Sequence, residues 1–414
     1  MRLLYIADGR SPIALNWIQH FIKTGHEVHL LSTYPCEPYP GLASLEVVPV
    51  GFSGFLARRP AGARGSAAER QGSSGSNLRA ALTGAGTIRL RTAVRHWLGP
   101  LTLRRAAGKA REMISRTQPD LVHAMRIPFE GALAAACDPE SPLLISVWGN
   151  DFTLHGPASP LMRRLTHRTV ARADALHTDC QRDQRLAPGW SLREGTRVIV
   201  LPGNGGVRSE IFNRSGPGVP SDPELAGTLK RIPPNSPTVV NPRGFRGYAR
   251  SDTFFRSIPK VLAARPEVAY LCPAMRGVPE AQRWIERLGV GQSVHLLPQL
   301  SPADMAIVFR RSLVSVSVTE HDGTPNTLLE AMACGTYPIA GDLESLREWI
   351  EDGRTGSLID PGDPAALARA VIQALQDEPL RAEAGRQNSR LIAERAGFAA
   401  GMARAEAAYH ELLS

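Results

Sequence analysis

The chain has 414 residues, which is too long for one ordinary domain and predicts at least two. Hydrophobic residues make up 43% and charged residues 21%, a composition that excludes a disordered or fibrous protein. The net charge of +9 is concentrated between residues 58 and 116, where thirteen Arg and Lys face two acids, so the remaining chain is slightly acidic and is not a typical nucleic-acid-binding protein.

The first half of the chain alternates between strand-like and helix-like segments. Apolar runs at 3–7, 27–32 and 44–50 predict strands, with a helix between the first two that stops at Gly25. The segment 51–90 is rich in Gly, Ser, Arg and Ala and predicts a mobile basic loop. Two further strands are predicted in 120–125 and 143–148. We therefore expect a Rossmann-like domain over 1–205.

The second half repeats this rhythm after a segment dense in Pro, Gly and Ser, so 206–236 is predicted to be a linker. A second Rossmann-like domain is expected over 237–396, with strands at 238–243, 268–274, 293–298, 313–318, 336–340 and 356–360. The last segment, 397–414, has an apolar stripe at helical spacing and is predicted to pack back on the N-terminal domain. The fold class is thus α/β with two Rossmann-like domains.

The most informative segment is 318–340, in which a predicted strand runs into Asp322, Gly323, Thr324 and Pro325. Pro325 is placed as the first residue of a helix, with Thr324 as its N-cap. A helix that begins at the carboxyl end of a parallel strand offers free N–H groups to a phosphate. Glu330 then lies among apolar residues of that helix, where a carboxylate needs donors such as sugar hydroxyls. A core helix with a salt-bridged glutamate is the alternative.

From 318 to about 376 the sequence resembles the retaining glycosyltransferases of family 4, whose fold, called GT-B, has two Rossmann-like domains facing each other across a cleft. The resemblance lies in an acidic residue (Asp322) followed after seven residues by Glu330 and then by AMACG, and it continues through a strand at 338–340, the stretch 351–356 and DPGDPAALARAV. The family usually has Glu where this chain has Asp322.

The resemblance implies a role for each residue of this loop and helix. Glu330 is expected to hold the ribose of a nucleotide-sugar, and Asp322 to contact the transferred sugar. Backbone N–H groups of the loop are expected to face the diphosphate. The residues implied in donor binding are Glu330, Gly323, Thr324, Pro325 and Asn326.

A diphosphate also needs cations. Arg243, Arg246 and Arg250 follow the predicted strand at 238–243, where the family carries an Arg and a Lys. Arg243 fits the family's Arg, and Arg246 or Arg250 is expected to replace the Lys with a forked donor. Solvated surface arginines are the alternative.

The N-terminal half resembles the acceptor-side domain of the same family through DGRSP, DLVHAM, VWGND and LPGNGGV. The resemblance implies that His123 lies near the transferred sugar, although Met125 occupies the second position where the family often has histidine, and a hydrogen-bonded core histidine is the alternative. The other acceptor-side candidates are Asp8, Gly9, Asn150, Asp151 and Asn204.

Other chemistries find no support in the sequence. The chain has no Asp-x-Asp, no phosphate-binding GxxxxGK[ST], no GxGxxG after a strand and no GxSxG. Its five cysteines are scattered and form no C-x-x-C pair. We therefore expect no metal, no cofactor besides the nucleotide-sugar co-substrate, and a reducing cytoplasmic environment.

The sequence thus predicts a metal-independent retaining glycosyltransferase that moves a sugar, from a UDP- or GDP-sugar, to a glycan or lipid-linked acceptor in polysaccharide biosynthesis. The alternative is a catalytically silent GT-B protein that binds a nucleotide-sugar or glycan. The basic segment 58–116, with an apolar run at 94–103, is either a peripheral contact with the inner face of the membrane or a solvated loop followed by an ordinary helix.

Overall fold

The computed structural model describes residues 1–53, 93–216 and 218–414, which form two compact units. Unit 1 consists of Met1–Thr178, Gln184–Ile199 and Glu406–Ser414, and unit 2 of Asp179–Asp183 and Val200–Ala405. The predicted mobile basic loop, 51–90, lies outside the described residues except for its first three.

Unit 1 is built on a seven-stranded sheet in the order β3-β2-β1-β4-β5-β6-β7. The pairs β1/β2, β1/β4, β2/β3, β4/β5 and β5/β6 are all parallel. The strands are β1 (Arg2–Ala7), β2 (Glu27–Ser32), β3 (Ser44–Val47), β4 (Leu121–Ala124), β5 (Leu143–Val147), β6 (Ala175–Thr178) and β7 (Arg197–Val200). The strand order reverses between β1 and β4, which is the point where ligands bind in open α/β sheets.

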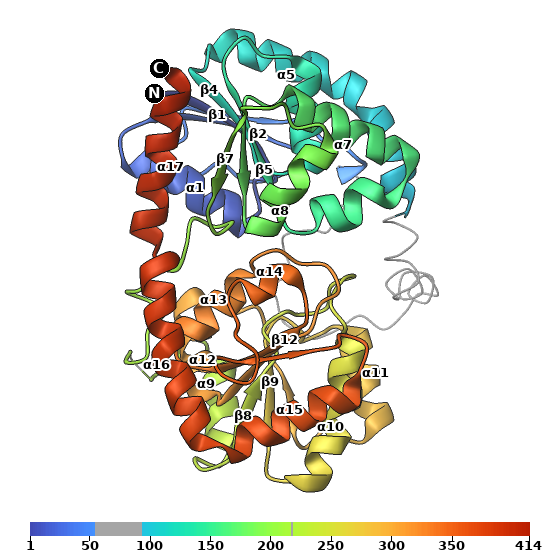
Figure 1. The fold of residues 1–414 in the computed structure, drawn as a ribbon, viewed down its shortest axis with the longest axis vertical. Helices are drawn as coiled ribbons and strands as arrows, with labels where there is room; N and C mark the ends of the chain where they lie inside the picture. The colour runs from blue at the N-terminus through green and yellow to red at the C-terminus, as the bar shows by residue number, and fades with distance from the viewer. Residues whose placement is uncertain (54–92, 217) are drawn as a thin grey trace, which may run out of the picture. The chain divides into compact units, whose positions relative to one another are not determined.

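Helices cover both faces of this sheet (Figure 1). The α5–α7 side carries a continuous aliphatic core, whereas α1 and the end of α17 bring aromatic side chains, Trp17, Phe21 and Tyr409, to the other face. The helices are α1 (Pro12–Lys23), α5 (Leu103–Thr117), α6 (Ala132–Cys137), α7 (Pro160–Arg172) and α8 (Gln181–Leu186), the last of which extends over both units.

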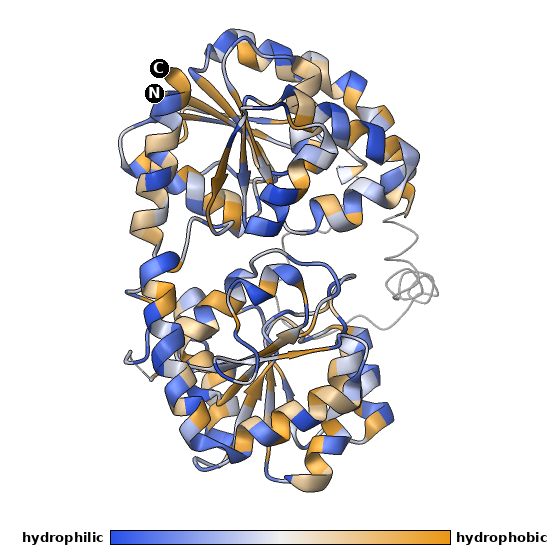
Figure 2. Cartoon of the chain, in the orientation of Figure 1, coloured by the Kyte–Doolittle hydropathy of each residue, from blue (hydrophilic) through white to orange (hydrophobic). Residues whose placement is uncertain are grey.

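Unit 2 is built on a six-stranded sheet in the order β10-β9-β8-β11-β12-β13, and all its neighbouring strands are parallel. The strands are β8 (Thr238–Val240), β9 (Ala269–Cys272), β10 (Val294–Leu296), β11 (Val314–Ser317), β12 (Tyr337–Gly341) and β13 (Ser357–Ile359). Every residue of β8, β9, β11 and β12 is buried, as expected for strands covered on both faces. Figure 2 shows these apolar strands at the centre of the unit.

Two hydrophobic clusters cover the two faces of this sheet, one under α10, α11 and α15 and one under α9, α12, α13 and α16. Many of the helices begin with Pro in the first turn after a capping Ser or Asp, as in α9, α12 and α15. The helices are α9 (Pro223–Arg231), α10 (Ser251–Ala264), α11 (Pro279–Leu288), α12 (Pro302–Arg311), α13 (Asn326–Ala333), α14 (Glu344–Arg347), α15 (Pro364–Gln376), α16 (Glu378–Arg395) and α17 (Phe398–Leu413).

The division of the chain differs from the one expected from the sequence. The predicted linker 206–236 belongs to unit 2, because it contains α9 and buries Phe212, Leu225 and Ile232 in the cluster of α12, α13 and α16. The C-terminal helix is also divided, since its residues up to Ala405 belong to unit 2 and those from Glu406 belong to unit 1. None of the helices that the structure describes is both long and apolar enough to span a membrane.

Candidate functional site

The candidate donor site lies at the carboxyl ends of β8 and β11, where the strand order of unit 2 reverses. Arg243 follows β8, and the Asp322–Thr324 loop follows β11 and leads into α13. The position is where a parallel α/β sheet binds ligands, because the loops after two adjacent strands diverge there and leave an opening.

Asp322 and Arg243 form a direct ion pair, with 2.6 Å between Asp322 Oδ2 and Arg243 Nη2. The backbone carbonyl of Asp322 is fixed separately, since it accepts hydrogen bonds from Arg182 Nη1 at 2.6 Å and Ser345 Oγ at 2.8 Å. Arg243 Nη1 also donates to Thr327 Oγ1 at 3.4 Å. The two predicted residues are therefore brought together, and the sequence analysis missed Arg182, which lies 140 residues from Asp322 and supports its loop.

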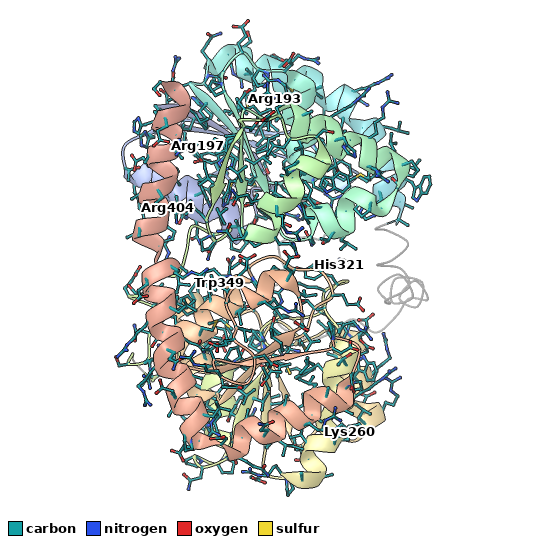
Figure 3. All side chains as sticks on the ribbon, in the orientation of Figure 1. Arg193, Arg197, Lys260, His321, Trp349 and Arg404 are labelled. Carbon is teal, nitrogen blue, oxygen red and sulfur yellow. The ribbon has the colours of Figure 1, made fainter. Side chains whose placement is uncertain are left out.

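The start of α13 differs by one residue from the prediction. The helix begins at Asn326, with Pro325 in the N-cap position, and Thr324 does not cap it. Thr324 Oγ1 instead accepts a hydrogen bond of 3.0 Å from Trp349 Nε1, so the hydroxyl anchors the loop. Figure 3 labels Trp349 and His321, which lie at the same end of unit 2. A Cβ on Gly323 would collide with the Asp179 carboxylate, so a larger residue there would force the Asp179 side chain to move.

Several buried polar atoms at this edge have no hydrogen-bond partner among the described residues. They are Arg243 Nε after β8, Ser317 Oγ and Thr319 Oγ1 at the end of β11, and Asn326 Oδ1 at the start of α13. A buried polar atom without a partner is costly, so a cluster of them indicates a place where a polar ligand completes the hydrogen bonds.

Glu330 lies one turn into α13, between the buried Leu329 and Ala331. Its side chain is half-buried and makes no hydrogen bond or ion pair with any residue that the structure describes. Burial raises the pKa of its carboxyl to about 8. Two hydroxyls donating to the carboxylate would relieve this penalty and favour the ionised form.

The other two predicted donor-side arginines differ in their surroundings. Arg250 is held by two carboxylates, Asp252 at 2.9 Å and Glu320 at 2.6 Å, so its charge is already compensated, and these partners raise its pKa. Arg246 is exposed, and its Nε donates to the Arg243 carbonyl at 3.1 Å. Arg246 is therefore the better candidate for a second cation.

His123 does not have the surroundings expected of a catalytic residue. It is 1% exposed on β4, its Nδ1 hydrogen-bonds to Tyr409 Oη at 2.6 Å, and its Nε2 hydrogen-bonds to Ser146 Oγ at 2.8 Å. Burial and His177 lower its pKa well below the usual range. With both ring nitrogens engaged, His123 has a core role, and the alternative weighed from the sequence is the one the structure favours.

The predicted acceptor-side residues are mostly structural supports at the carboxyl edge of the unit 1 sheet. Asp151 is fully buried and accepts from Arg126 Nε at 3.1 Å and from two backbone N–H groups. Burial raises the pKa of Asp151 to about 6 against the opposing effect of Arg126. Asn150 Oδ1 accepts from Arg126 Nη2 at 3.1 Å. The residue they both hold, Arg126, was not singled out in the sequence, although it directly follows DLVHAM.

The loop after β1 is built in a similar way. Asp8 forms a bidentate ion pair with Arg10, with both bonds at 3.0 Å, and Gly9 N–H donates to Ser32 Oγ at 3.0 Å. Asn204 belongs to unit 2, where its Oδ1 accepts from Gly206 N–H at 3.1 Å and shapes a turn. Because these groups shape their own loops, other residues would have to contact an acceptor at the carboxyl edge of the unit 1 sheet, which we call the acceptor edge.

One group of three potential metal ligands comes together among the described residues, Asp179, Cys180 and Asp183. Asp183 already pairs with Arg182 at 2.8 Å, and burial raises the pKa of the Cys180 thiol, which disfavours a thiolate ligand. The chemistry of these three side chains therefore does not fit a metal ion.

Two family models match the chain. One, described as "Glycosyl transferase 4-like domain", matches residues 9–204, and the other, "Glycosyl transferases group 1", matches residues 276–390. Together with the sequence relatives, these matches show that the chain belongs to the GT-B glycosyltransferases, in a family similar to family 4.

Known proteins similar to this chain include the D-inositol 3-phosphate glycosyltransferase of Streptomyces avermitilis, which is 26% identical over 282 residues, covering 65% of this chain and 56% of the relative. The chain thus spans about half the length of the curated relatives it matches. Two solved structures share the fold: sucrose-phosphate synthase from Thermosynechococcus elongatus, with a TM-score of 0.72, 15% identity and coverage of 99% and 98%, and Anabaena HepE in complex with UDP-glucose, with a TM-score of 0.70, 14% identity and coverage of 99% and 100%.

Proposed function

We propose that this protein is a retaining, metal-independent glycosyltransferase that takes a sugar from a nucleotide-diphosphate sugar. The observation that carries the proposal is Glu330, a half-buried carboxylate without a partner among the described residues, one turn inside the helix whose N-terminus follows the Asp322–Thr324 loop. That loop, the helix N–H groups and Arg243 are suited to a diphosphate, and Glu330 is suited to the ribose hydroxyls.

The proposed reaction is a front-face displacement. The acceptor hydroxyl attacks the anomeric carbon on the side from which the diphosphate leaves, the carbon–oxygen bond to the diphosphate breaks, and the hydroxyl proton passes to a leaving phosphate oxygen. Arg243 would stabilise the charge that develops on the diphosphate, using its unpartnered Nε, while Asp322 holds Nη2. Positioning of the two substrates would supply about 7–11 kcal/mol of the barrier.

The nucleotide is proposed to be UDP or GDP, because the structurally similar HepE was solved in complex with UDP-glucose and the family resemblance allows either. A thermal-shift screen with UDP, GDP, ADP and dTDP tests this, and one nucleotide is expected to raise the melting temperature far more than the others. Turnover is expected to continue in EDTA, since the positive charge comes from Arg243 and backbone N–H groups.

The acceptor is proposed to be a glycan or a lipid-linked molecule, as in polysaccharide biosynthesis. Because a relative is named for D-inositol 3-phosphate, inositol phosphates belong in the first acceptor panel. Release of nucleotide diphosphate from a donor, lost in Glu330→Ala, supports the enzyme. Binding of the nucleotide-sugar without turnover for any acceptor would instead support a catalytically silent GT-B protein.

We also propose that the protein acts in the cytoplasm and touches the membrane surface through the described part of its basic segment. Val94, Trp97, Leu98 and Leu101 are exposed, with Trp97 at 56% and Leu101 at 65%, whereas Leu103 is in the core. Exposed basic side chains follow at Arg104, Arg105 and Lys109. An apolar cluster beside cations is typical of contact with anionic lipid.

Sedimentation with phosphatidylglycerol vesicles tests the membrane contact. Leu101→Ser is expected to weaken binding by about tenfold, whereas Leu161→Ser, a change at another exposed leucine of unit 1, is expected to leave it unchanged. Equal binding of both variants would contradict the proposal.

A further inference from the structure

The sheet of unit 1 has its own strand-order reversal, between β1 and β4, and two charged side chains near it have no ionic partner. The loop after β1 carries Asp8 and Arg10, which neutralise each other. The segment after β4 carries Arg126, which is neutralised by Asp151, and then Glu130. Glu130 forms no ion pair with any described residue.

Glu130 is deeply buried, but only one of its two carboxylate oxygens has a hydrogen-bond partner among the described residues. Its side chain is 2% exposed, and Oε1 accepts a hydrogen bond of 2.6 Å from Thr33 Oγ1, the residue after β2. Oε2 is buried and has no hydrogen-bond partner among the described residues. A buried carboxylate oxygen without a donor is costly, so this atom calls for a hydroxyl or another donor from outside the protein.

Arg95 provides the opposite charge in the same place. It lies just before η1 (Gly99–Thr102), and its guanidinium carbon is 5.0 Å from the ring centre of Phe129 and 5.6 Å from that of Tyr34. Its buried Nε has no hydrogen-bond partner among the residues that the structure describes. Phe129 directly precedes Glu130 in the chain. Arg95 therefore lies over the ring of the residue that precedes Glu130, and the two charged side chains form no ion pair within the described part of the chain.

Tyr34 is close enough to both residues for their charges to act on it. The guanidinium of Arg10 stacks on its ring at 3.9 Å. Burial raises the pKa of the Tyr34 hydroxyl, and the charges of Arg95 and Glu130 act on it in opposite directions. Two opposite charges that lie near the same aromatic side chain and do not pair with each other match a ligand that itself carries an anion and a hydroxyl.

We infer that Glu130 and Arg95 are the two poles of an acceptor site, in which Glu130 Oε2 accepts a hydrogen bond from an acceptor hydroxyl and the Arg95 guanidinium binds a phosphate group of the same acceptor. The acceptor class is therefore a polyhydroxylated phosphate ester. This inference rests on the proposed glycosyltransferase function and names its second substrate. A guanidinium fork fits phosphate through two parallel hydrogen bonds.

Binding to the full-length chain tests each pole separately, with myo-inositol 1-phosphate, myo-inositol and inorganic phosphate as probes. Glu130→Gln is expected to raise the dissociation constants of both inositols by about tenfold, because a charge-assisted hydrogen bond is lost, and to leave that of inorganic phosphate unchanged. Arg95→Gln is expected to remove the preference for the phosphorylated over the unphosphorylated inositol.

Glu112→Gln and Arg163→Gln are matched controls, because both residues are exposed in unit 1 and belong neither to the site nor to the proposed membrane contact. Nucleotide affinity and slow donor hydrolysis should be the same in all four variants, so a failure of the donor site is distinguishable from a failure of the acceptor site. If wild type binds no phosphorylated inositol, or if Glu130→Gln and Arg95→Gln bind as tightly as their controls, the inference is wrong.

The phosphate ester has two sources, a free polyol phosphate or a phospholipid headgroup, and the same variants distinguish them. Vesicles containing phosphatidylinositol in phosphatidylcholine are compared with soluble myo-inositol 1-phosphate. Transfer to the soluble probe indicates a free acceptor, whereas transfer to vesicles alone indicates a headgroup. In either case the loss in Glu130→Gln supports the inference, and unchanged transfer contradicts it.

Discussion

The two units reverse their strand order in the same way, but they distribute charge differently at that point. In unit 2 the residues after the central strands β8 and β11, Arg243 and Asp322, pair directly with each other, and one carboxylate, Glu330, stands apart on a helix. In unit 1 the pairs Asp8–Arg10 and Arg126–Asp151 form within the loops, and the unmatched groups are of both signs, Glu130 and Arg95.

Under the proposed function, the two units use one topology for two kinds of ligand. The loop of unit 2 is fixed through its backbone, because the Asp322 carbonyl is bound by Arg182 and Ser345. Fixed backbone N–H groups suit a part of the ligand that is the same in every nucleotide-diphosphate sugar, namely the diphosphate. Unit 1 instead has charged side chains that lie against aromatic rings, and such side chains can be substituted without altering the sheet.

The largest effect is expected at Glu330. Glu330→Ala should weaken nucleotide binding by about a hundredfold, since two charge-assisted hydrogen bonds to the ribose are lost. Isothermal titration with the nucleotide found in the thermal-shift screen measures this. Glu394→Gln, at an exposed helical glutamate of the same unit, is the control, and an equal affinity in both variants would remove Glu330 from the donor site.

The next largest effect is expected at Arg243, whose guanidinium acts through its planar, forked shape as well as through its charge. Arg243→Lys keeps the charge but loses the guanidinium fork, in which Nη2 binds Asp322 and Nε remains for the diphosphate. The kcat/KM for the donor should therefore fall by about tenfold to a hundredfold. Arg256→Lys, an exposed change in α10, should have no effect. A full rescue of turnover by lysine would show that only charge matters here.

A smaller but diagnostic effect concerns pH. The pKa of Glu330 is raised to about 8, so the free protein holds a proton there at neutral pH, and a ligand that needs the carboxylate must displace it. Nucleotide affinity should therefore rise with pH by up to about tenfold per unit below pH 8 and level off above it. Titrations in buffers of different ionisation enthalpy measure the released proton, and Glu330→Gln should abolish the pH dependence.

The raised pKa of Glu330 also affects stability, which should fall with rising pH where nucleotide affinity rises. Because the folded state holds the proton more tightly than the unfolded state, the contribution of Glu330 to the free energy of unfolding should decrease with rising pH. The decrease should run from the ordinary pKa of a glutamate up to about pH 8. Denaturant unfolding of wild type and Glu330→Gln should therefore converge at low pH and diverge at high pH, with wild type the less stable.

The smallest effect is expected in the core of unit 1. Tyr409→Phe removes the hydroxyl that contacts both His123 Nδ1 at 2.6 Å and Tyr5 Oη at 3.1 Å, and it should lower the free energy of unfolding by about 1–3 kcal/mol. Nucleotide binding should not change. If Tyr409→Phe instead abolished turnover at unchanged stability, His123 would have a part in catalysis after all.

Much of the architecture could be predicted from the sequence. Apolar runs located the central strands of both sheets, and the Pro after Thr324 indicated a helix, although it begins one residue later because Pro325 takes the N-cap position. Asp322, Arg243 and Glu330 were singled out because motif spacing is local, and their part in donor binding stays a prediction. Arg182 was missed because its contact with Asp322 joins residues far apart in the chain, and no local pattern reports such a contact.

The acceptor edge was harder to predict for a physical reason. Glu130 and Arg95 are distinctive only because each has a buried polar atom without a hydrogen-bond partner among the described residues, and a missing partner is a property of the folded surroundings rather than of a sequence pattern. His123 shows the converse, since its motif pointed to chemistry while its burial and its two hydrogen bonds point to packing. The predicted loop 51–90 lies almost wholly outside the described residues and remains a prediction.

The hydrogen bond between Trp349 and Thr324 gives the chain an intrinsic optical reporter. The indole N–H of Trp349 donates directly to the loop that is proposed to receive the diphosphate, and the emission of an indole depends on its hydrogen bond and local polarity. Of the six tryptophans, Trp349 should therefore account for most of a fluorescence change on nucleotide addition, so occupancy can be followed without a label.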